Sequence, residues 1–418
     1  MSKEKDSKKK KLNLEKGKKL ASKQVRDAEA KTAKAKGVDI PPLKNNGDGC
    51  VAFEMKEIRA KVSSALDMLS VTKTLEDESS ENSILVDFRR DGCMIHYLKS
   101  GAYACLEVTG TVFKPGAFVV DAGLFRAIKG DAPFVYFIIN RESNAVEFKC
   151  GRTKGSVQLL NTAKEYLTQA PEQLQGNDVI LSKTLIVDTF SKLLFNSFDP
   201  AIPALGLPLN ISSGKNGITV TSNDNIVGSL YSRLEKACDK FKACVPGQSF
   251  IKIAKNMPYD TVRCSFSENM FRIRCKGVDV THPSGSYDLV DLLSWLEEDK
   301  KLKPDYEIIL PTNQFIDAID SAMCMSVIDK TESNISVEFG SDSGKVIFLG
   351  SNTQSRSTFP VTKVLKSGKQ QSFITNGKRI LSFIALLKGF KEFRLRVSQG
   401  RAYLFAPDES FVFLVPLS

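Results

Sequence analysis

The strongest constraint in this 418-residue sequence is one order of elements, a strand, a helix and three strands, that recurs after residue 49. In its first occurrence, Val51–Glu54 predicts a strand and Lys56–Leu69 predicts a helix, because apolar residues recur at helical spacing along one face. Turn signals at Asp91-Gly92 and Ser100-Gly101 then separate three strands. These strands are Ile84–Phe88, Met94–Leu98 and Tyr103–Val108. Strands joined by such short turns favour antiparallel sheets.

The pattern restarts at Phe118 and returns in two further copies. The first copy continues with Phe118–Val120, the helix Ala122–Lys129, and strands Phe134–Ile139, Ala145–Cys150 and Ser156–Leu160. The second copy has Val179–Leu181, the helix Lys183–Phe195, strands near Leu209–Ser212, Ile218–Thr221 and Val227–Tyr231, a helix near Ile251–Asn256, and strands Thr261–Phe266 and Met270–Cys275. The third has Glu307–Leu310, the helix Asn313–Met325, strands Ile335–Phe339, Val346–Gly350, Ser357–Val361 and Ser372–Ile374, the helix Gly377–Leu387, and strands Phe393–Val397, Ala402–Phe405 and Phe411–Val415. Three copies of about 115 residues therefore predict an α+β protein built from a repeated unit.

Length and cysteine usage narrow the class of protein further. A chain of this length holds roughly two to four domains. No apolar run approaches the roughly 20 residues that a membrane span needs, and no apolar segment follows the first lysines, so we expect a cytoplasmic protein. The nine cysteines occur without a CxxC pair, which favours free thiols in a reducing compartment over disulfides or a zinc site.

The net charge of +11 is concentrated at one end of the chain. Residues 1–36 contain 14 Lys/Arg and 5 Asp/Glu, whereas the remainder contains 45 and 43. The consecutive Lys8, Lys9, Lys10 and Lys11, with no aromatic residue nearby, predict a solvated basic arm, and Pro41-Pro42 predicts a linker over 37–49. Flexible lysines release counterions on binding a polyanion, so we expect the arm to contact DNA. A solubilising tail and a localisation signal are the alternatives.

Enzyme motifs are absent from the sequence. The two histidines, His96 and His282, fall in different copies, and there is no Walker A loop, no GxGxxG after a strand and no HExxH. The carboxylates are dispersed rather than clustered as metal ligands. We therefore expect no catalysis, no cofactor and no metal, although a nucleic-acid enzyme with an unrecognised site stays open as an alternative.

Four segments are informative through their order and spacing. They are Phe118–Gly130, a strand followed by a short helix; Val146–Leu159, two strands around a Gly-Arg turn; Val278–Tyr287, which contains His282-Pro283; and the C-terminal Phe411–Ser418, with a proline near its end. In that order they resemble the bacterial-type DNA sliding clamp, the DNA polymerase III beta subunit family, over residues 50–418. The resemblance implies a DNA clamp fold of three similar domains, each of two βαβββ units, with helices lining the inner face and antiparallel sheets outside.

The resemblance also implies boundaries. We expect a basic flexible arm and linker over 1–49, clamp domains over 50–172, 177–287 and 305–418, and a linker containing Trp295 over 288–304. The arm and the Trp295 linker depart from typical members of the family. They fit a divergent clamp, such as one encoded by a phage.

The function implied is that of a DNA polymerase processivity factor. Two copies would close a ring around double-stranded DNA without sequence preference, because a positive lumen that contacts only phosphates permits sliding. Open sheet edges at the protomer ends would pair to close the ring. A DNA polymerase, and a clamp loader where one is needed, would bind through short hydrophobic peptides at the nucleoid or replication site of a bacterial or phage-infected cell. The alternative is a monomeric clamp-like processivity factor or transcription co-activator that uses its basic arm instead of ring closure.

The candidate DNA-binding residues lie on the solvent side of the helices and on nearby turns. They are Lys56, Arg59, Arg126, Lys129, Arg152, Lys154, Lys183, Lys192, Lys252, Lys255, Lys378, Arg379, Lys388 and Lys391. Each could equally be an ordinary solvated charge. The helix Asn313–Met325 fits poorly, because its exposed charges are Asp317 and Asp320.

The family's peptide groove lies between its second and third domains. The matching positions are Leu205, Ser222, Val227, Pro258, Val262, Phe413, Val415 and Pro416. Leu205, Val227 and Val262 could instead be core strand residues. We expect Phe413 and Val415 to remain accessible, because the end of a chain is hard to bury fully.

Overall fold

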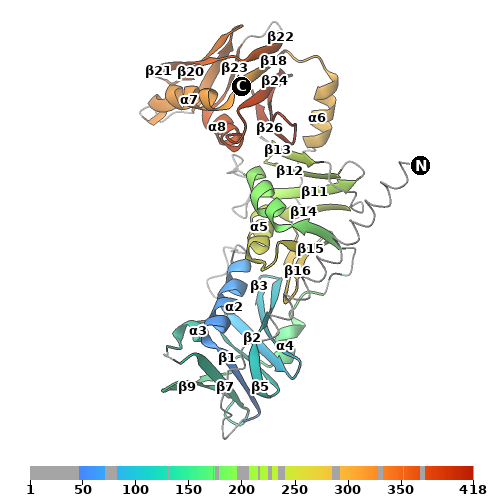
Figure 1. Ribbon diagram of the computed structural model, residues 1–418, viewed down its shortest axis with the longest axis vertical. Coiled ribbons are helices and arrows are strands. Elements are labelled where there is room, and N and C mark those ends of the chain that lie inside the picture. The colour runs from blue at the N-terminus through green and yellow to red at the C-terminus, as the bar shows by residue number, and fades with distance from the viewer. Residues whose placement is uncertain are drawn as a thin grey trace, which may run out of the picture. The chain divides into compact units, whose positions relative to one another are not determined.

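Strands and helices follow one another in nearly the predicted order through the described part of the chain (Figure 1). The computed structural model describes residues 47–70, 82–129, 132–172, 174, 178–194, 207–214, 217–224, 228–233, 241–284, 292–327, 333–351, 353–367 and 372–417. The chain divides into two units, Met1–Asn46 and Gly47–Ser418, and the described residues all belong to the second. The predicted basic arm, with Lys8, Lys9, Lys10 and Lys11, lies outside the described residues.

The first predicted copy begins with a strand that leads directly into a helix. Its elements are β1 (Gly49–Glu54), α2 (Met55–Met68), β2 (Ser83–Arg89), β3 (Gly92–Lys99), β4 (Ala102–Val108), β5 (Gly110–Lys114), β6 (Gly116–Asp121), α3 (Gly123–Ala127), β7 (Phe134–Asn140), β8 (Ala145–Cys150), β9 (Thr153–Gln158) and α4 (Ala163–Thr168). Helix α2 forms where Met55, Ile58, Val62 and Ala65 recur every three or four residues, and this face is buried. The predicted helix and strands are confirmed, while β5 and α4 were not predicted.

The second predicted copy differs from expectation in its first helix. Its elements are β10 (Val179–Ser182), η2 (Leu185–Thr189), η3 (Phe190–Leu193), β11 (Pro208–Gly214), β12 (Gly217–Asn223), β13 (Gly228–Arg233), β14 (Phe241–Pro246), α5 (Gly247–Asn256), β15 (Thr261–Phe266), β16 (Met270–Cys275) and β17 (Val278–Pro283). The prediction of one α-helix over Lys183–Phe195 is wrong, because η2 is a π-helix and η3 a 3-10 helix. The Phe190 amide donates to the Leu185 carbonyl, five residues back, and both side chains are buried.

The third predicted copy is preceded by a helix where the sequence predicted a linker. The elements are α6 (Leu292–Lys301), β18 (Tyr306–Pro311), α7 (Thr312–Ala322), η4 (Met323–Val327), β19 (Asn334–Phe339), β20 (Ser343–Leu349), β21 (Gln354–Pro360), β22 (Lys363–Ser367), β23 (Ser372–Asn376), α8 (Gly377–Leu386), β24 (Glu392–Ser398), β25 (Arg401–Phe405) and β26 (Phe411–Pro416). The predicted helix ending at Met325 finishes as the 3-10 turn η4. Helix α6 occupies most of the expected 288–304 linker.

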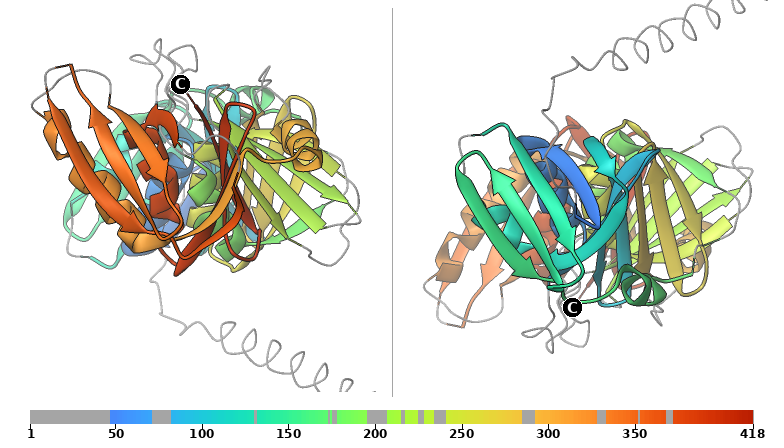
Figure 2. Two further views of the ribbon diagram at one scale, coloured as in Figure 1. Left: turned by 90° about the horizontal axis from the view of Figure 1, so that it is seen from above. Right: turned by 90° about the horizontal axis from the view of Figure 1, so that it is seen from below.

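The described strands form four antiparallel sheets. Their orders are β5-β1-β7-β8-β9, β10-β15-β16-β17-β4-β3-β2-β6, β14-β11-β12-β13-β26-β25-β24-β18-β22 and β21-β20-β19-β23. The first sheet ends on β9 and the last sheet begins on β21. Each of these two strands pairs with one neighbour among the described strands. Figure 2 shows the sheets from above and from below. The expected α+β class with antiparallel sheets is confirmed.

Two of these sheets join strands from different predicted copies. In junction one, β4 pairs with β17, so that Ala104 lies opposite Val280. In junction two, β13 pairs with β26, so that Leu230 lies opposite Val412. Each junction turns strands of two copies into one continuous sheet, which satisfies backbone groups that would otherwise be exposed at strand edges.

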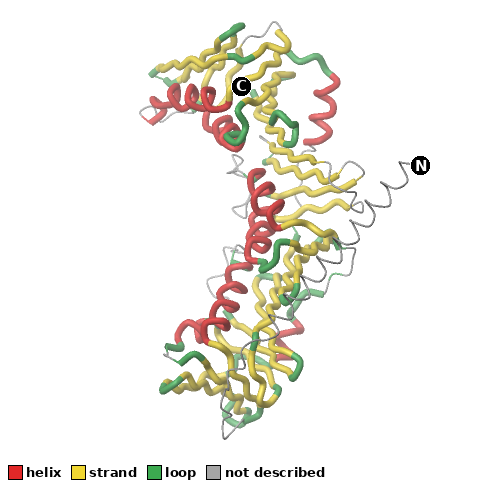
Figure 3. The backbone as a smooth tube through the Cα atoms, viewed as in Figure 1, coloured by secondary structure: helices red, strands yellow, loops and turns green. Residues whose placement is uncertain are grey.

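The helices of the first two copies pack together beside the strands. Helix α2 contacts α5, and Figure 3 shows the two helices next to each other with strands to one side. The buried side chains of the first two copies form one continuous cluster that includes Ile58 and Ile253. Those of the third copy form another, which includes Phe315 and Phe383. The sheets are therefore stabilised by helices that pack on one face as well as by strand pairing.

Candidate nucleic-acid interface and partner groove

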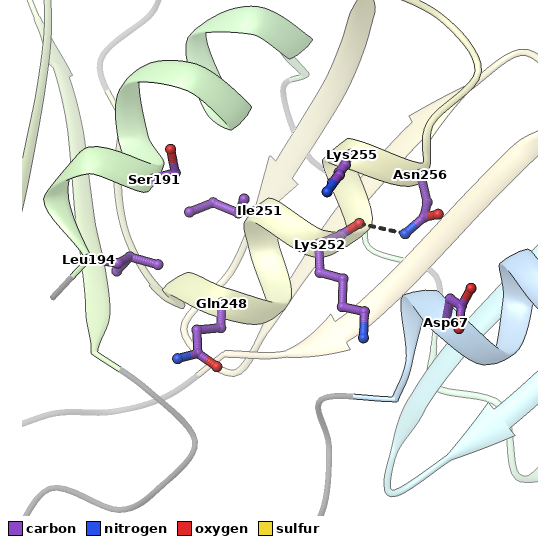
Figure 4. A pocket seen from close by; sticks show the side chains of 8 residues that line it. All are labelled: Asp67, Ser191, Leu194, Gln248, Ile251, Lys252, Lys255 and Asn256. Atoms are coloured by element: carbon purple, nitrogen blue, oxygen red, sulfur yellow. Dashed lines mark hydrogen bonds between the residues drawn. The ribbon is translucent and has the colours of Figure 1, made fainter. Parts of the chain in front are cut away.

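A cavity of about 570 Å³ lies where α2, η3 and α5 meet. Gln248, Lys252 and Lys255 fall on one face of α5, because they are spaced four and three residues apart. The Lys252 ammonium donates a hydrogen bond to the Ser70 hydroxyl, just beyond α2. The lining residues, drawn in Figure 4, are Asp67, Ser191, Leu194, Gln248, Ile251, Lys252, Lys255 and Asn256.

The lysines that line this cavity have no carboxylate partner in an ion pair within the part of the chain that the structure describes. No lysine among the described residues forms an ion pair, because every ion pair between described residues joins an arginine to a carboxylate. Lys255 is exposed and Lys252 is half-buried, while Asp67 is the one acidic side chain that lines the cavity. Two ammonium groups beside one carboxylate give the cavity a positive balance, which suits a phosphate.

Three of the predicted DNA-binding residues already make contacts inside the fold. The Arg59 guanidinium donates to the carbonyls of Phe125 and Ile128 and so ties α2 to the end of α3. The Lys183 ammonium donates to the Met257 carbonyl at 2.7 Å, just after the last turn of α5. These contacts, with that of Lys252, show that the three side chains also have structural roles.

The remaining predicted basic residues are mostly exposed. Exposed side chains are Lys56, Arg126, Lys129, Arg152, Lys154, Lys192, Lys255, Lys378, Lys388 and Lys391. Lys154 lies on edge strand β9 beside Lys149, on the row that faces away from the core, rather than on the predicted turn. The ammonium of Lys192, on η3, lies 5.9 Å from the Phe411 ring centre.

The N-terminus of α8 carries two of the predicted residues. Asn376 caps the helix, because its side-chain oxygen accepts hydrogen bonds from the amides of Lys378 and Arg379. Cations at the positive end of a helix dipole are unfavourable for helix stability. Their presence here adds to a local positive field that favours an anion. Helix α7 has the opposite character, because Asp317 and Asp320 are exposed, as the sequence predicted.

The residues predicted for the partner groove are only partly brought together. Ser222, Ser229 and Phe413 lie side by side across β12, β13 and β26 at junction two. Val262 is buried on β15, in a different sheet, and Pro258 is exposed after α5. Leu205 and Val227 lie outside the described residues, as does the side chain of Pro416.

The expectation that Phe413 and Val415 remain accessible is wrong. Both side chains are fully buried, because they face the apolar cluster of the third copy. Strand β26 itself pairs on both sides, with β13 and with β25. A strand near the chain end is thus an interior strand of its sheet. Ser222 is also fully buried, so these three residues do not line an open groove in this structure.

Sequence reasoning missed polar and aromatic features of junction two. Ser229 is fully buried, and its hydroxyl donates to the Leu193 carbonyl at 2.8 Å. At the other end of the β13–β26 pairing, a cavity of about 660 Å³ opens beside Tyr231, Phe411 and Phe390. The sequence carries the aromatic residues, but only strand pairing between distant segments brings them together. The Gln248–Lys252–Lys255 spacing, in contrast, could have been found on the sequence.

The two histidines are structural in their surroundings. Burial lowers the pKa of His96, whose Nδ1 lies 2.7 Å from the Tyr103 hydroxyl. Burial also lowers the pKa of His282, which donates from Nδ1 to the Pro283 carbonyl. Over the described residues, no three His, Cys, Asp or Glu side chains gather as metal ligands. None of the described helices is both long enough and apolar enough to cross a bilayer.

Comparison with known proteins gives a clear result at the level of structure. The sequence matches no protein-family model and no curated protein. The DNA polymerase sliding clamp of Bacillus subtilis, however, aligns with a TM-score of 0.74 at 16% identity, covering 89% of this chain and 99% of that one. The DNA polymerase III beta chain of Streptococcus pneumoniae gives 0.73 at 11% identity, covering 88% and 99%.

A third solved structure extends the match to another bacterial group. The DNA polymerase III beta subunit of Pseudomonas aeruginosa gives a TM-score of 0.72 at 11% identity, again covering 88% and 99%. The alignments span almost the entire length of each solved chain, so the similarity is not limited to one repeat. This chain has the sliding-clamp fold of bacterial DNA polymerase III beta subunits.

Proposed function

We propose that this protein is a non-catalytic sliding clamp that encircles double-stranded DNA and tethers a DNA polymerase. The observation that carries the proposal is a sliding-clamp fold whose helices present lysines without ion-pair partners, above all Lys252 and Lys255. Contacts from mobile ammonium groups to phosphates provide retention without sequence preference. We assign the three clamp domains to residues 50–172, 177–287 and 305–418, and place the activity at cytoplasmic replication sites.

Two strands that junctions one and two leave with one paired neighbour support ring closure. Each junction pairs the last strand of one βαβββ unit with the last strand of another, β4 with β17 and β13 with β26. The two remaining last strands are β9 and β21, each with one paired neighbour among the described strands. In the proposed ring, β9 of each protomer pairs with β21 of its partner, which gives a homodimer.

The partner peptide is proposed to bind beside junction two. The family-based assignment puts the groove at Leu205, Ser222, Val227, Pro258, Val262, Phe413, Val415 and Pro416. Of these, Ser222 and Phe413 lie at one end of this junction. The aromatic cavity at Tyr231, Phe411 and Phe390 is at the other end. Deleting Leu417–Ser418 alters the first end without removing the buried Val415, and Phe390→Ala alters the second. Loss of polymerase-peptide binding in the first variant alone supports the assigned groove, and loss in the second alone moves the site to the cavity.

Retention on primed circular DNA tests the clamp itself. We expect the wild-type protein to remain on a circle and to slide off after the circle is linearised, because only a topological ring distinguishes the two templates. The variant Lys252→Glu with Lys255→Glu should weaken retention at low salt. Lys363→Glu with Lys366→Glu, two exposed lysines of β22, is a control with the same change of charge. Equal retention on circular and linear DNA would reject the ring.

A second candidate is a monomeric DNA-bound processivity factor or transcription co-activator that holds DNA through residues 1–36. The charge of those residues, 14 Lys/Arg against 5 Asp/Glu, favours it. Mass measurement in solution separates a monomer from a dimer. Deletion of residues 1–36 should abolish DNA binding for the monomeric alternative, whereas a ring should still be retained on circles. Binding of a 1–40 peptide to DNA that did not weaken with salt would contradict the expected phosphate contacts.

A further inference from the structure

Edge strands β9 and β21 have a pairing register that junctions one and two define. In junction one, Leu106, Cys105 and Ala104 lie opposite Val278, Asp279 and Val280. In junction two, Tyr231, Leu230 and Ser229 lie opposite Phe411, Val412 and Phe413. The two ladders therefore equate Leu106 with Tyr231 on one strand and Val278 with Phe411 on the other.

The hairpins that precede β9 and β21 extend these equivalences. Val278 is the first residue of β17 and follows a two-residue turn after Cys275, just as Thr153 is the first residue of β9 after Cys150. On the other strand, Tyr231 lies three residues after Gly228, which pairs with Asn223 at the hairpin end; Ser357 lies three residues after Gln354, which pairs with Leu349. Thr153 and Ser357 are thus the counterparts of Val278 and Tyr231.

This equivalence fixes which side chains would meet. Ser357 lies opposite Thr153, Arg356 opposite Lys154, and Ser355 opposite Gly155. Lys154 and Arg356 are both exposed and form no ion pair within the described residues. Lys149 continues the same row next to Lys154 on β8. The outward row of this third junction therefore places cations directly opposite each other.

The corresponding positions in junctions one and two do not place like charges opposite each other. Cys105 faces Asp279 in junction one, and Leu230 faces Val412 in junction two. The inward row also differs, because Ser–Thr and Ser–Gly pairs replace the Leu106–Val278 and Ala104–Val280 pairs of junction one. The third junction lacks the apolar inward pairs of junction one, and its outward row places two cations opposite each other.

We propose that the protein pairs β9 with β21 of a second copy in this register, and that repulsion between Lys154 and Arg356 makes the closure weak at low ionic strength. The inference rests on the proposed ring and adds its register and its dependence on salt. Screening of like charges stabilises the closed form, so the dimer tightens as salt rises. An acidic residue at either position converts repulsion into attraction.

The experiment measures the dimer dissociation constant of the full-length chain by sedimentation equilibrium at low and high NaCl concentration. Lys154→Glu and Arg356→Glu should each tighten the dimer by about fivefold per interface, and by about 25-fold for a ring with two interfaces. Added salt should weaken the dimer of each single variant, whereas it should tighten the dimer of the wild-type protein. The double variant places two carboxylates opposite each other. Its dimer should again be weak and should tighten as salt is added.

A matched control and three outcomes decide the matter. Lys363→Glu changes the net charge equally on a strand outside this junction and should leave the dissociation constant unchanged. Dimerisation with no effect of either single variant would overturn the register while leaving the ring intact. A monomer in every variant and at every salt concentration would overturn both. A tighter dimer in each single variant, together with a weak dimer in the double variant, supports the register.

Discussion

At junction one the outer face of the sheet carries polar side chains, whereas at junction two it carries apolar side chains beneath a helix. Arg272 forms an ion pair with Asp279 beside junction one, and Arg274 forms one with Asp178 in the segment that leads to β10. At junction two, Leu292 and Leu296 of α6 pack on Leu230, Val412 and Leu414. Each connecting segment therefore matches the chemistry of the sheet it crosses.

The comparison shows how one pairing scheme tolerates divergent sequence. Strand pairing supplies the backbone hydrogen bonds at both junctions and makes no demand on side-chain polarity. The outer face can then be stabilised by ion pairs or by apolar burial. We expect junction one to respond to loss of an ion-pair partner and to pH, and junction two to respond to loss of apolar volume.

The largest expected effect is at the apolar junction. Leu296→Ala should lower the free energy of unfolding by about 3 kcal/mol, because Leu296 is 7% exposed and its removal leaves a cavity under α6. Denaturant unfolding measures the change, and hydrogen exchange in β13 and β26 locates it. Leu302→Ala, at a side chain 40% exposed, should cost less than about 0.5 kcal/mol. Equal effects of the two substitutions would contradict the role of α6.

The next effect is at the polar junction. Arg272→Met keeps the apolar stem but leaves the Asp279 carboxylate without its ion pair, and should cost about 2 kcal/mol. The Arg272 side chain is 9% exposed, so salt screens this pair weakly. Arg89→Met is the control, because the Arg89–Asp87 pair joins a largely exposed arginine and should contribute less than about 1 kcal/mol. Urea unfolding of both variants would reveal whether burial makes the difference.

A smaller effect tests the polar contact within the apolar junction. The Tyr403 hydroxyl donates to the Asp299 carboxylate of α6, which also pairs with Arg401. Tyr403→Phe should cost about 1 kcal/mol, since Arg401 still compensates the buried charge. Tyr259→Phe, at an exposed tyrosine, should be neutral. Thermal unfolding of the two variants compares them, and a neutral Tyr403→Phe would limit the attachment of α6 to its apolar side chains.

The smallest effect is a pH dependence beside junction one. Burial lowers the folded-state pKa of His96 and His282 below the ordinary value of about 6.5, so the unfolded chain binds protons first as the pH falls. Stability is therefore complete well above pH 6.5 and declines as the pH falls, by less than about 1 kcal/mol between pH 7.5 and 5.5. Unfolding at both pH values should show this decline in the wild-type protein. In His96→Asn with His282→Asn the decline should disappear, and its persistence would assign it to other groups.

Much of the fold could be predicted from local sequence signals. The apolar spacing of Ile58, Val62 and Ala65 predicted α2, and Ser100-Gly101 marked the β3–β4 turn correctly. Strands β5 and β22 were missed, because each is short, has no fully buried side chain among its described residues and alternates weakly. Helix α6 was missed because its apolar residues gain a partner only when β13 and β26 come together.

The candidate sites were less predictable than the fold. Lysine side chains on helix surfaces were identified, but the sequence carried no sign that Arg59 and Lys183 would bind backbone carbonyls. The burial of Phe413 depends on a strand almost 200 residues earlier in the sequence. Such contacts between distant segments decide which residues are accessible, and no local pattern encodes them.

The connecting segments at junctions one and two have a consequence for protein abundance. Strands joined through one polypeptide meet at a high effective concentration, so junctions one and two are indifferent to dilution. Pairing of β9 with β21 in the proposed ring obeys mass action instead. The number of molecules in the cell would then help to set the fraction of closed rings, and a change in expression level would shift that fraction without any change in sequence.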